Sequence, residues 1–140
     1  MIKTQKWFKR TKTGTIAGTT DLTGAWASLS GPLSCADYNT LTLWLEIDAN
    51  LSLDIRFRIV LMREYAGSEY SPIIHTVDSD KVRFQARYFE YDVDAANLNI
   101  IEKFDIAEAN FFKIYVMAGT AGATVGKITN AYYSMSTAVA

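Results

Sequence analysis

Hydrophobic and polar residues alternate strictly in two stretches of this chain, residues 41–47 (LTLWLEI) and 55–61 (IRFRIVL). Successive side chains of a β-strand point to opposite faces, so each stretch presents one apolar face. Turn-forming residues separate the two stretches at positions 48–52. The pattern predicts an antiparallel hairpin with one face in a hydrophobic core and the other facing outward.

Strand-like runs separated by turn signals recur along the rest of the chain, a spacing typical of a sandwich or jelly roll. The predicted strands cover residues 2–8, 25–29, 40–48, 54–63, 71–77, 81–93, 100–104, 111–117 and 127–136, with single helical turns at 94–98 and 107–110. The fold class predicted is all-β, a two-sheet antiparallel sandwich of the jelly-roll type with an extended N-terminal arm. Its predicted core consists of Leu43, Leu45, Ile47, Ile55, Phe57, Ile59, Phe84, Phe112, Ile114 and Val116.

The longest predicted strand, residues 81–93, changes phase in its middle. Apolar residues occupy even positions from 82 to 86 and odd positions from 89 to 93. A β-bulge near Arg87 and Tyr88 would turn both series toward one core, and we favour this interpretation. A partner that covers the second face is the alternative.

A chain of 140 residues is long enough for one domain with its own core. Its single cysteine, Cys35, cannot form an intrachain disulfide, which fits assembly in a cytosol. The first residues do not resemble a secretory signal, and no window holds the roughly 20 apolar residues of a membrane helix. We therefore expect a soluble protein.

Charge is distributed unevenly along the chain. The net charge is -1, but residues 1–20 contain five basic and no acidic residues, so they sum to +5 and the remainder sums to -6. We therefore divide the chain into a basic N-terminal arm and loop, residues 1–23, and a β-sandwich domain, residues 24–140. Such an arm could bind an acidic neighbour, an identical subunit or nucleic acid. Alternatively, its lysines discourage pairing at a sheet edge.

Few residues of this chain fit a catalytic or metal-binding motif. The single histidine, His75, has no partners for a triad or a zinc site. Asp92, Asp94, Asn97 and Asn99 could supply oxygens to calcium, but the glycine and closing glutamate of an EF-hand are absent and the same residues also favour turns. No phosphate-binding glycine loop is present. We expect no cofactor, no metal and no enzymatic activity, with a glycosidase-like carboxylate pair as the remaining catalytic alternative.

Two outward-facing patterns suggest interaction surfaces. Arg56 and Arg58 on one strand, with Arg83 and Arg87 on another, would share a face if the strands were neighbours; intramolecular salt bridges or an anionic partner would then offset their repulsion. Trp44 lies on the outward parity of its strand, as do Val60 and Met62 on theirs. Such an apolar patch marks a protein interface or a platform for stacking on sugars, unless a second layer of chain covers it.

Three segments together carry a resemblance: residues 34–47, the Gly/Ala/Thr loop at 119–126 and the closing strand at 127–135. In this arrangement the chain resembles small jelly-roll structural proteins of tailed-phage virions, namely decoration, cement or fibre-associated proteins. The resemblance implies a non-enzymatic virion component, assembled in the host cytoplasm. It also implies contacts with the major capsid protein or neighbouring structural subunits, and a homo-oligomer. We expect no membrane partner and do not expect nucleic acid as the main partner.

Candidate interface residues follow from the basic arm and the outward patterns. They are Lys3, Lys6, Trp7, Phe8, Lys9, Arg10, Trp44, Arg56 and Arg58. The rival function is a carbohydrate-binding module with the same sandwich, in which Trp44 or loop aromatics stack on sugars.

Overall fold

The computed structural model describes residues 10–17, 20–49, 53–72, 75–79, 82–86, 88–93, 97–106, 108–118 and 126–137. All regular secondary structure within these residues is β, and none of them forms a helix long and apolar enough to cross a membrane.

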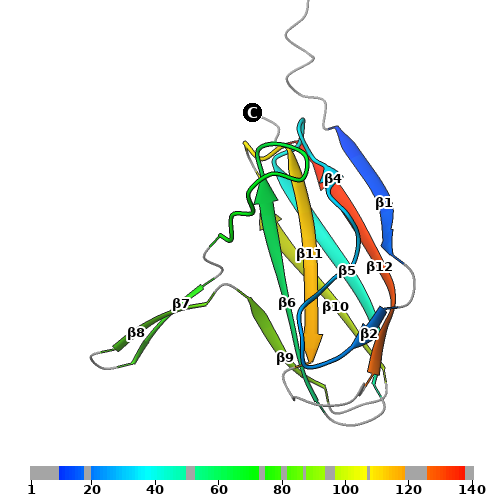
Figure 1. The fold of residues 1–140 in the computed structure, drawn as a ribbon, viewed down its shortest axis with the longest axis vertical. Helices are drawn as coiled ribbons and strands as arrows, with labels where there is room; N and C mark the ends of the chain where they lie inside the picture. Colours follow the sequence, from blue (N-terminus) through cyan, green and yellow to red (C-terminus); the bar gives the residue numbers. More distant parts are fainter. Residues whose placement is uncertain are drawn as a thin grey trace, which may run out of the picture.

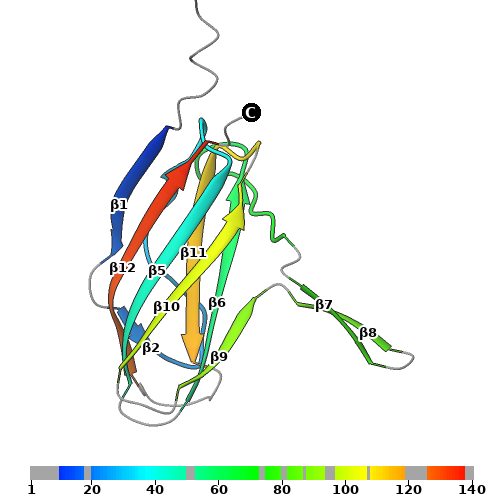
Figure 2. The same ribbon diagram turned by 180° about the vertical axis from the view of Figure 1, so that it is seen from behind.

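The strands form two antiparallel sheets that pack face to face, seen from opposite sides in Figures 1 and 2. The first sheet has the order β1 (Thr11–Ala17), β12 (Gly126–Ser136), β5 (Thr40–Ala49) and β10 (Asn97–Asp105), and β2 (Thr20–Leu22) also pairs with β12. In the second sheet β3 (Ala27–Ser28) and β4 (Leu33–Ser34) pair with β11 (Phe111–Ala118), followed by β6 (Leu53–Met62) and β9 (Phe89–Val93). The predicted all-β two-sheet sandwich is therefore confirmed.

The strand order is that of a jelly roll. We count β1 with β2, and β3 with β4, as interrupted strands, and set aside the separate hairpin of β7 (His75–Ser79) and β8 (Val82–Ala86). The eight strands that result can be numbered in chain order. Neighbouring strands across the first sheet are then the first, eighth, third and sixth, and across the second sheet the second, seventh, fourth and fifth. This connectivity is that of two Greek keys wound into a double-sheet jelly roll.

The core lies between the inner faces of the two sheets. Nine of the predicted core residues are buried there: Leu43, Leu45, Ile47, Ile55, Phe57, Ile59, Phe112, Ile114 and Val116. The tenth, Phe84, lies on β8, where side chains are outside the described residues. Full burial of each such side chain contributes about 1.5–3 kcal/mol. The rings of Phe112 and Tyr133 meet across the core edge to face, with centroids 5.8 Å apart.

The predicted hairpin of residues 41–47 and 55–61 is wrong. Its two strands, β5 and β6, follow one another in the chain but lie in different sheets: β5 pairs with β10 and β12, and β6 pairs with β9 and β11. Both apolar faces do point into one core, from opposite sides. Alternation determines which face is buried, but it carries no information about the pairing partner.

The phase change in residues 81–93 is not a bulge. It is the boundary between β8, which pairs only with β7 among the described strands, and β9, which joins the second sheet. The β7–β8 hairpin projects away from the sandwich (Figures 1 and 2). The helical turn predicted at residues 94–98 is also contradicted, because β10 already begins at Asn97.

Residues 11–17 and 20–22 do not form the loop that was predicted within residues 1–23. Thr11–Ala17 pairs along β12 as β1, and Thr20–Leu22 continues the edge as β2. Backbone hydrogen bonding extends to Arg10, whose N–H donates to Thr137 Oγ1 at 3.0 Å and whose carbonyl accepts from Thr137 N at 3.0 Å. These residues therefore belong to the sandwich, whereas residues 1–9, including the strand predicted at 2–8, lie outside the described residues.

The thiol of Cys35 is expected to be inert in the native protein. Cys35 is fully buried, and burial raises its pKa to about 11. Because the folded-state pKa is raised, the group stays protonated at pH 8, and reaction with Ellman's reagent should be at least about a hundred-fold slower than in denaturant. Equal rates in the folded and unfolded protein would contradict this burial.

Candidate functional site

A row of side chains runs across the outer face of the first sheet. Strand register places Thr15 beside Tyr132, Tyr132 beside Trp44, and Trp44 beside Ile101. Three of them are unusually exposed for large apolar side chains: Trp44 at 45 %, Ile101 at 53 % and Tyr132 at 38 %. With strands about 4.8 Å apart, the row extends for about 14 Å. The outward exposure predicted for Trp44 is confirmed.

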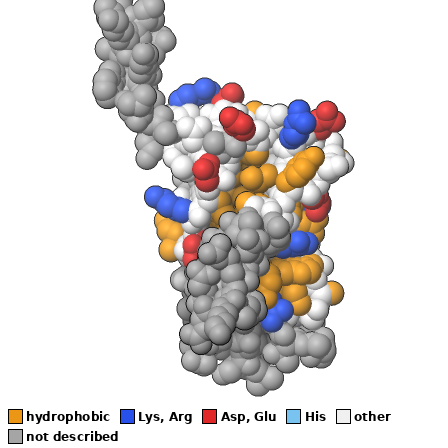
Figure 3. Space-filling model, turned by 90° about the vertical axis from the view of Figure 1, so that its left-hand side faces the viewer, with side chains coloured by type: hydrophobic (Ala, Val, Ile, Leu, Met, Phe, Trp, Pro, Cys, Tyr) orange, Lys and Arg blue, Asp and Glu red, His pale blue; other side chains and the backbone are white. Residues whose placement is uncertain are grey.

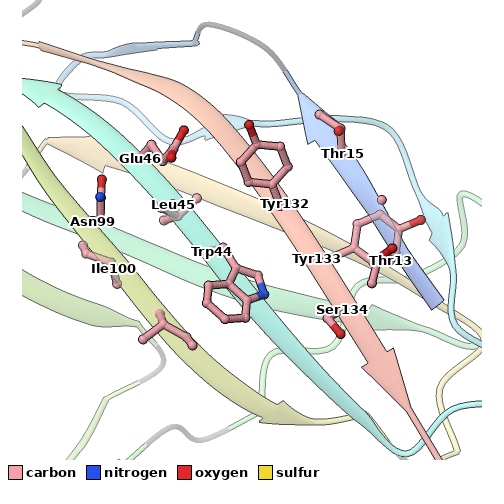
Figure 4. Close-up of a pocket in the computed structure, with 12 residues that line it drawn as sticks. Thr13, Thr15, Trp44, Leu45, Glu46, Asn99, Ile100, Tyr132, Tyr133 and Ser134 are labelled. Atoms are coloured by element: carbon pink, nitrogen blue, oxygen red, sulfur yellow. The ribbon is translucent and has the colours of Figure 1, made fainter. Parts of the chain in front are cut away.

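This row lies in a groove with a volume of about 740 Å³. The groove is lined by Thr13, Gly14, Thr15, Trp44, Leu45, Glu46, Asn99, Ile100, Ile101, Tyr132, Tyr133 and Ser134, most of which are labelled in Figure 4. The indole of Trp44 lies near the middle of this set, between β12 and β10. The volume falls within the range of about 300–1,000 Å³ that is typical of ligand sites.

Polar side chains border the apolar row on both sides. On one side, register aligns Asn130, Glu46 and Asn99, and Asn130 Nδ2 donates a hydrogen bond to Glu46 Oε1 at 2.7 Å. On the other side, Thr13 and Ser134 are paired. The groove therefore combines an apolar centre with amide, carboxylate and hydroxyl groups at its margins.

A β-bulge in β12 brings Tyr132 to the groove. The register of β12 against β5 shifts between Ile128 and Asn130, and Thr129 Oγ1 donates to the carbonyl of Glu46 at 3.1 Å. Inward positions are even before the shift and odd after it, with Ile128 and Tyr133 both buried. Without the extra residue Tyr132 would point into the core, so the bulge turns it outward. Tyr132 was not among the residues predicted for a site, although the change of parity along residues 126–136 was a signal in the sequence.

The two candidate arginines lie on the outer face of the second sheet, opposite the groove. The Arg58 guanidinium stacks between two rings, 4.8 Å from the centroid of Trp26 and 4.9 Å from that of Tyr115. Arg56 lies 5.1 Å from the centroid of Tyr88, and the Trp26 and Tyr88 centroids are 6.0 Å apart. These cation–π contacts hold the arginines against their own sheet.

The face of four clustered arginines predicted from the sequence does not form. Arg83 belongs to β8 in the separate hairpin, and Arg87 lies outside the described residues. Glu46, an acidic residue on the neighbouring predicted strand, is on the other sheet and does not lie beside Arg56. Figure 3, viewed from the side on which the hairpin projects, shows basic, acidic and hydrophobic side chains interspersed over the part of this face that is coloured.

Val60 and Met62, predicted to be exposed beside Trp44, are instead buried in the other sheet. The segment 63–72 folds back over this face: Glu69 Oε2 accepts hydrogen bonds from Tyr115 Oη at 2.7 Å and from Lys113 Nζ at 3.2 Å. The Tyr115 hydroxyl, followed by Lys113, lowers the pKa of Glu69 against the opposing effect of burial. The sequence left open whether a second layer of chain covers the outward apolar residues. Such a layer covers the outer face of the second sheet, whereas Trp44 on the first sheet stays exposed.

The remaining candidates do not form one site. Lys3, Lys6, Trp7, Phe8 and Lys9 lie outside the described residues, and Arg10 is exposed immediately before β1. Trp44 and the arginine pair lie on opposite faces, so they cannot belong to one flat interface.

The candidate calcium ligands are distributed over two strands and residues outside the described part of the chain. Asp92 is on β9, Asn97 and Asn99 are on β10, and Asp94 is outside the described residues. In the described part of the chain no three His, Cys, Asp or Glu side chains converge as a metal site would require. His75 lies on β7, where side chains are not described.

Comparisons with known proteins support the fold. No protein-family model and no curated protein matches the sequence. Among solved structures, the SPBc2 prophage-derived protein YomS matches 93 % of this chain and 96 % of its own, with 11 % identity and a TM-score of 0.53. A chain of the T13 infectious bursal disease virus particle matches 92 % of this chain with 12 % identity and a TM-score of 0.57, and a chain of the Gx strain of that virus gives 0.55.

These likenesses establish a shared β-sandwich fold at very low sequence identity. The chain spans only about a third of the two viral chains, 31 % and 32 % of their lengths. It matches YomS over nearly the full length of both proteins.

Proposed function

We propose that this protein is a non-enzymatic structural component of a virus particle, a decoration, cement or fibre-associated protein that assembles in the host cytoplasm. The observation that carries the proposal is the jelly-roll sandwich itself, which is similar over its whole extent to a prophage-derived protein and to a segment of a virus-particle chain. Its partners are the major capsid protein or neighbouring structural subunits, including copies of itself.

The N-terminal segment is the proposed contact with these partners. Residues 1–10 contain Lys3, Lys6, Lys9 and Arg10 around the adjacent aromatics Trp7 and Phe8. Aromatic anchors surrounded by charge are the usual composition of a compact protein interface. The hydrogen bonds between Arg10 and Thr137 hold the base of the segment at one end of the sandwich.

A non-enzymatic role is supported by the chemistry of the described residues. The one cysteine is buried with a raised pKa, so it offers no thiolate nucleophile. Glu46 lies in the groove, and the other groove side chains are hydroxyl, amide and apolar groups, without a second carboxylate for paired acid and base catalysis.

The proposal predicts that the chain is a stoichiometric part of a particle and that residues 2–9 attach it there. Virus particles purified from cells carrying this gene should contain the intact chain at fixed stoichiometry by quantitative mass spectrometry. A variant lacking residues 2–9 should melt within about 2 °C of the full chain, because β1 begins only at Thr11, but should be lost from the particles.

Two results separate the parts of this proposal. Absence of the full chain from purified particles would overturn the virion role. Retention of the shortened chain in particles would overturn the role of the N-terminal segment alone. A matched control in which Lys3, Lys6 and Lys9 become glutamine tests whether charge or the aromatic pair provides the attachment.

A further inference from the structure

We propose that the groove on the outer face of the first sheet binds a neutral oligosaccharide. This inference rests on the geometry of the groove and is independent of the proposed virion role. The ligand class follows from three features: an exposed aromatic centre, uncommitted polar groups at its margins, and two central strands whose backbones are already paired on both sides.

The aromatic centre suits the apolar face of a sugar ring. Trp44 and Tyr132 are direct cross-strand neighbours near the middle of the sheet, and each keeps more than a third of its surface exposed. A pyranose ring has C–H groups on its faces and hydroxyls at its edge, so its face can pack on an aromatic side chain without losing hydration of those hydroxyls. An apolar patch of this kind, placed in a groove rather than on a convex surface, is typical of a binding site.

The polar margins can then bind the hydroxyls at the ring edge. Among the described residues, the side chains of Thr13, Thr15, Ser134 and Asn99 make no hydrogen bonds, and only Asn130 donates to the Glu46 carboxylate. The groove therefore offers donors and acceptors of both kinds, including the indole N–H of Trp44. A ligand rich in hydroxyl groups uses such a set better than an apolar one.

The charged groups that line the groove favour a neutral ligand. Among the residues that line the groove, Glu46 carries the one carboxyl group, and no lysine or arginine is among them. A carboxylate beside the ligand repels uronic or sialic acids, which lack a compensating cation here.

An extended peptide fits this surface less well. The groove is centred on β12 and β5, and each of these strands has hydrogen-bonded neighbours on both sides. A peptide strand therefore cannot pair with the backbones of these two strands, and backbone pairing is the main source of affinity when an extended peptide binds to a sheet. A ligand at the centre of the groove must be recognised through side chains alone.

The test uses the full chain and a panel of neutral malto-, cello-, xylo-, manno- and chito-oligosaccharides, with sialylated and uronic-acid glycans as the charged comparison. Binding is measured by isothermal titration calorimetry and by saturation-transfer NMR at millimolar ligand concentration. We expect at least one neutral oligosaccharide to bind. We expect Trp44→Ala to weaken it by at least about ten-fold, and Trp44→Tyr to restore most of the affinity because the ring is retained.

A matched control distinguishes loss of the site from loss of the fold. Tyr65 is exposed in the segment that crosses the other sheet, so Tyr65→Ala should leave binding within about two-fold of the wild type. All variants should retain the wild-type circular dichroism spectrum. Failure of every neutral oligosaccharide to bind, or binding that Trp44→Ala leaves unchanged, would overturn the inference. A preference for acidic glycans would overturn the role given to Glu46.

Discussion

Replacement of Phe112 by alanine is expected to lower the free energy of unfolding by about 3–5 kcal/mol. Phe112 is fully buried on β11, and its ring packs edge to face on Tyr133 of the opposite sheet. Its removal leaves a cavity between the sheets that the close-packed core can fill only in part. Urea unfolding followed by circular dichroism measures the effect.

Graded variants keep this prediction testable if the alanine variant fails to fold. Phe112→Leu retains most of the volume and should cost about 1–1.5 kcal/mol. Ile101→Thr exchanges one β-branched residue for another at an exposed position of the other sheet. Its free energy of unfolding should stay within about 0.5 kcal/mol of the wild type. Equal losses at positions 112 and 101 would contradict the arrangement of the two sheets.

Replacement of Gly14 by valine is expected to cost about 1–3 kcal/mol by overpacking. Gly14 pairs with Tyr133, and a Cβ atom at this glycine would lie 2.7 Å from the Cε1, Cζ and Oη atoms of the tyrosine ring. The ring cannot withdraw freely because it packs on Phe112. Thermal and urea unfolding of the variant measure the loss.

The sign of the change in stability shows whether β1 is packed against the core. Valine favours strands, so in an undocked edge strand the same change would be neutral or stabilising. Thr13→Val, next to Gly14 but on the exposed outer face, is the matched control and should stay within about 0.5 kcal/mol. A variant Gly14→Val as stable as the wild type would show that β1 is not packed against Tyr133.

The expected residues of the site were partly visible in the sequence. Trp44 could be placed on an outer face because it alternates along its strand with a regular series of inward-facing leucines. Tyr132 could not, because its orientation depends on the bulge at Thr129, which shifts the parity of β12 by one residue. Nor could pairing of these two strands be derived, since they are about 85 positions apart in the chain and meet only through the Greek-key connectivity.

The local alternation of apolar and polar residues was sufficient to predict that the chain is all-β. It also predicted which side chains of β5, β6 and β11 are buried. Only the tertiary structure decided which strands are neighbours, because backbone hydrogen bonds between strands carry no sequence code of their own. The strand pairing separated β5 from β6, joined β1 and β2 to the first sheet, and brought Glu69 against Tyr115 on the outer face of the second sheet. It also placed Tyr132 beside Trp44 and so created the groove.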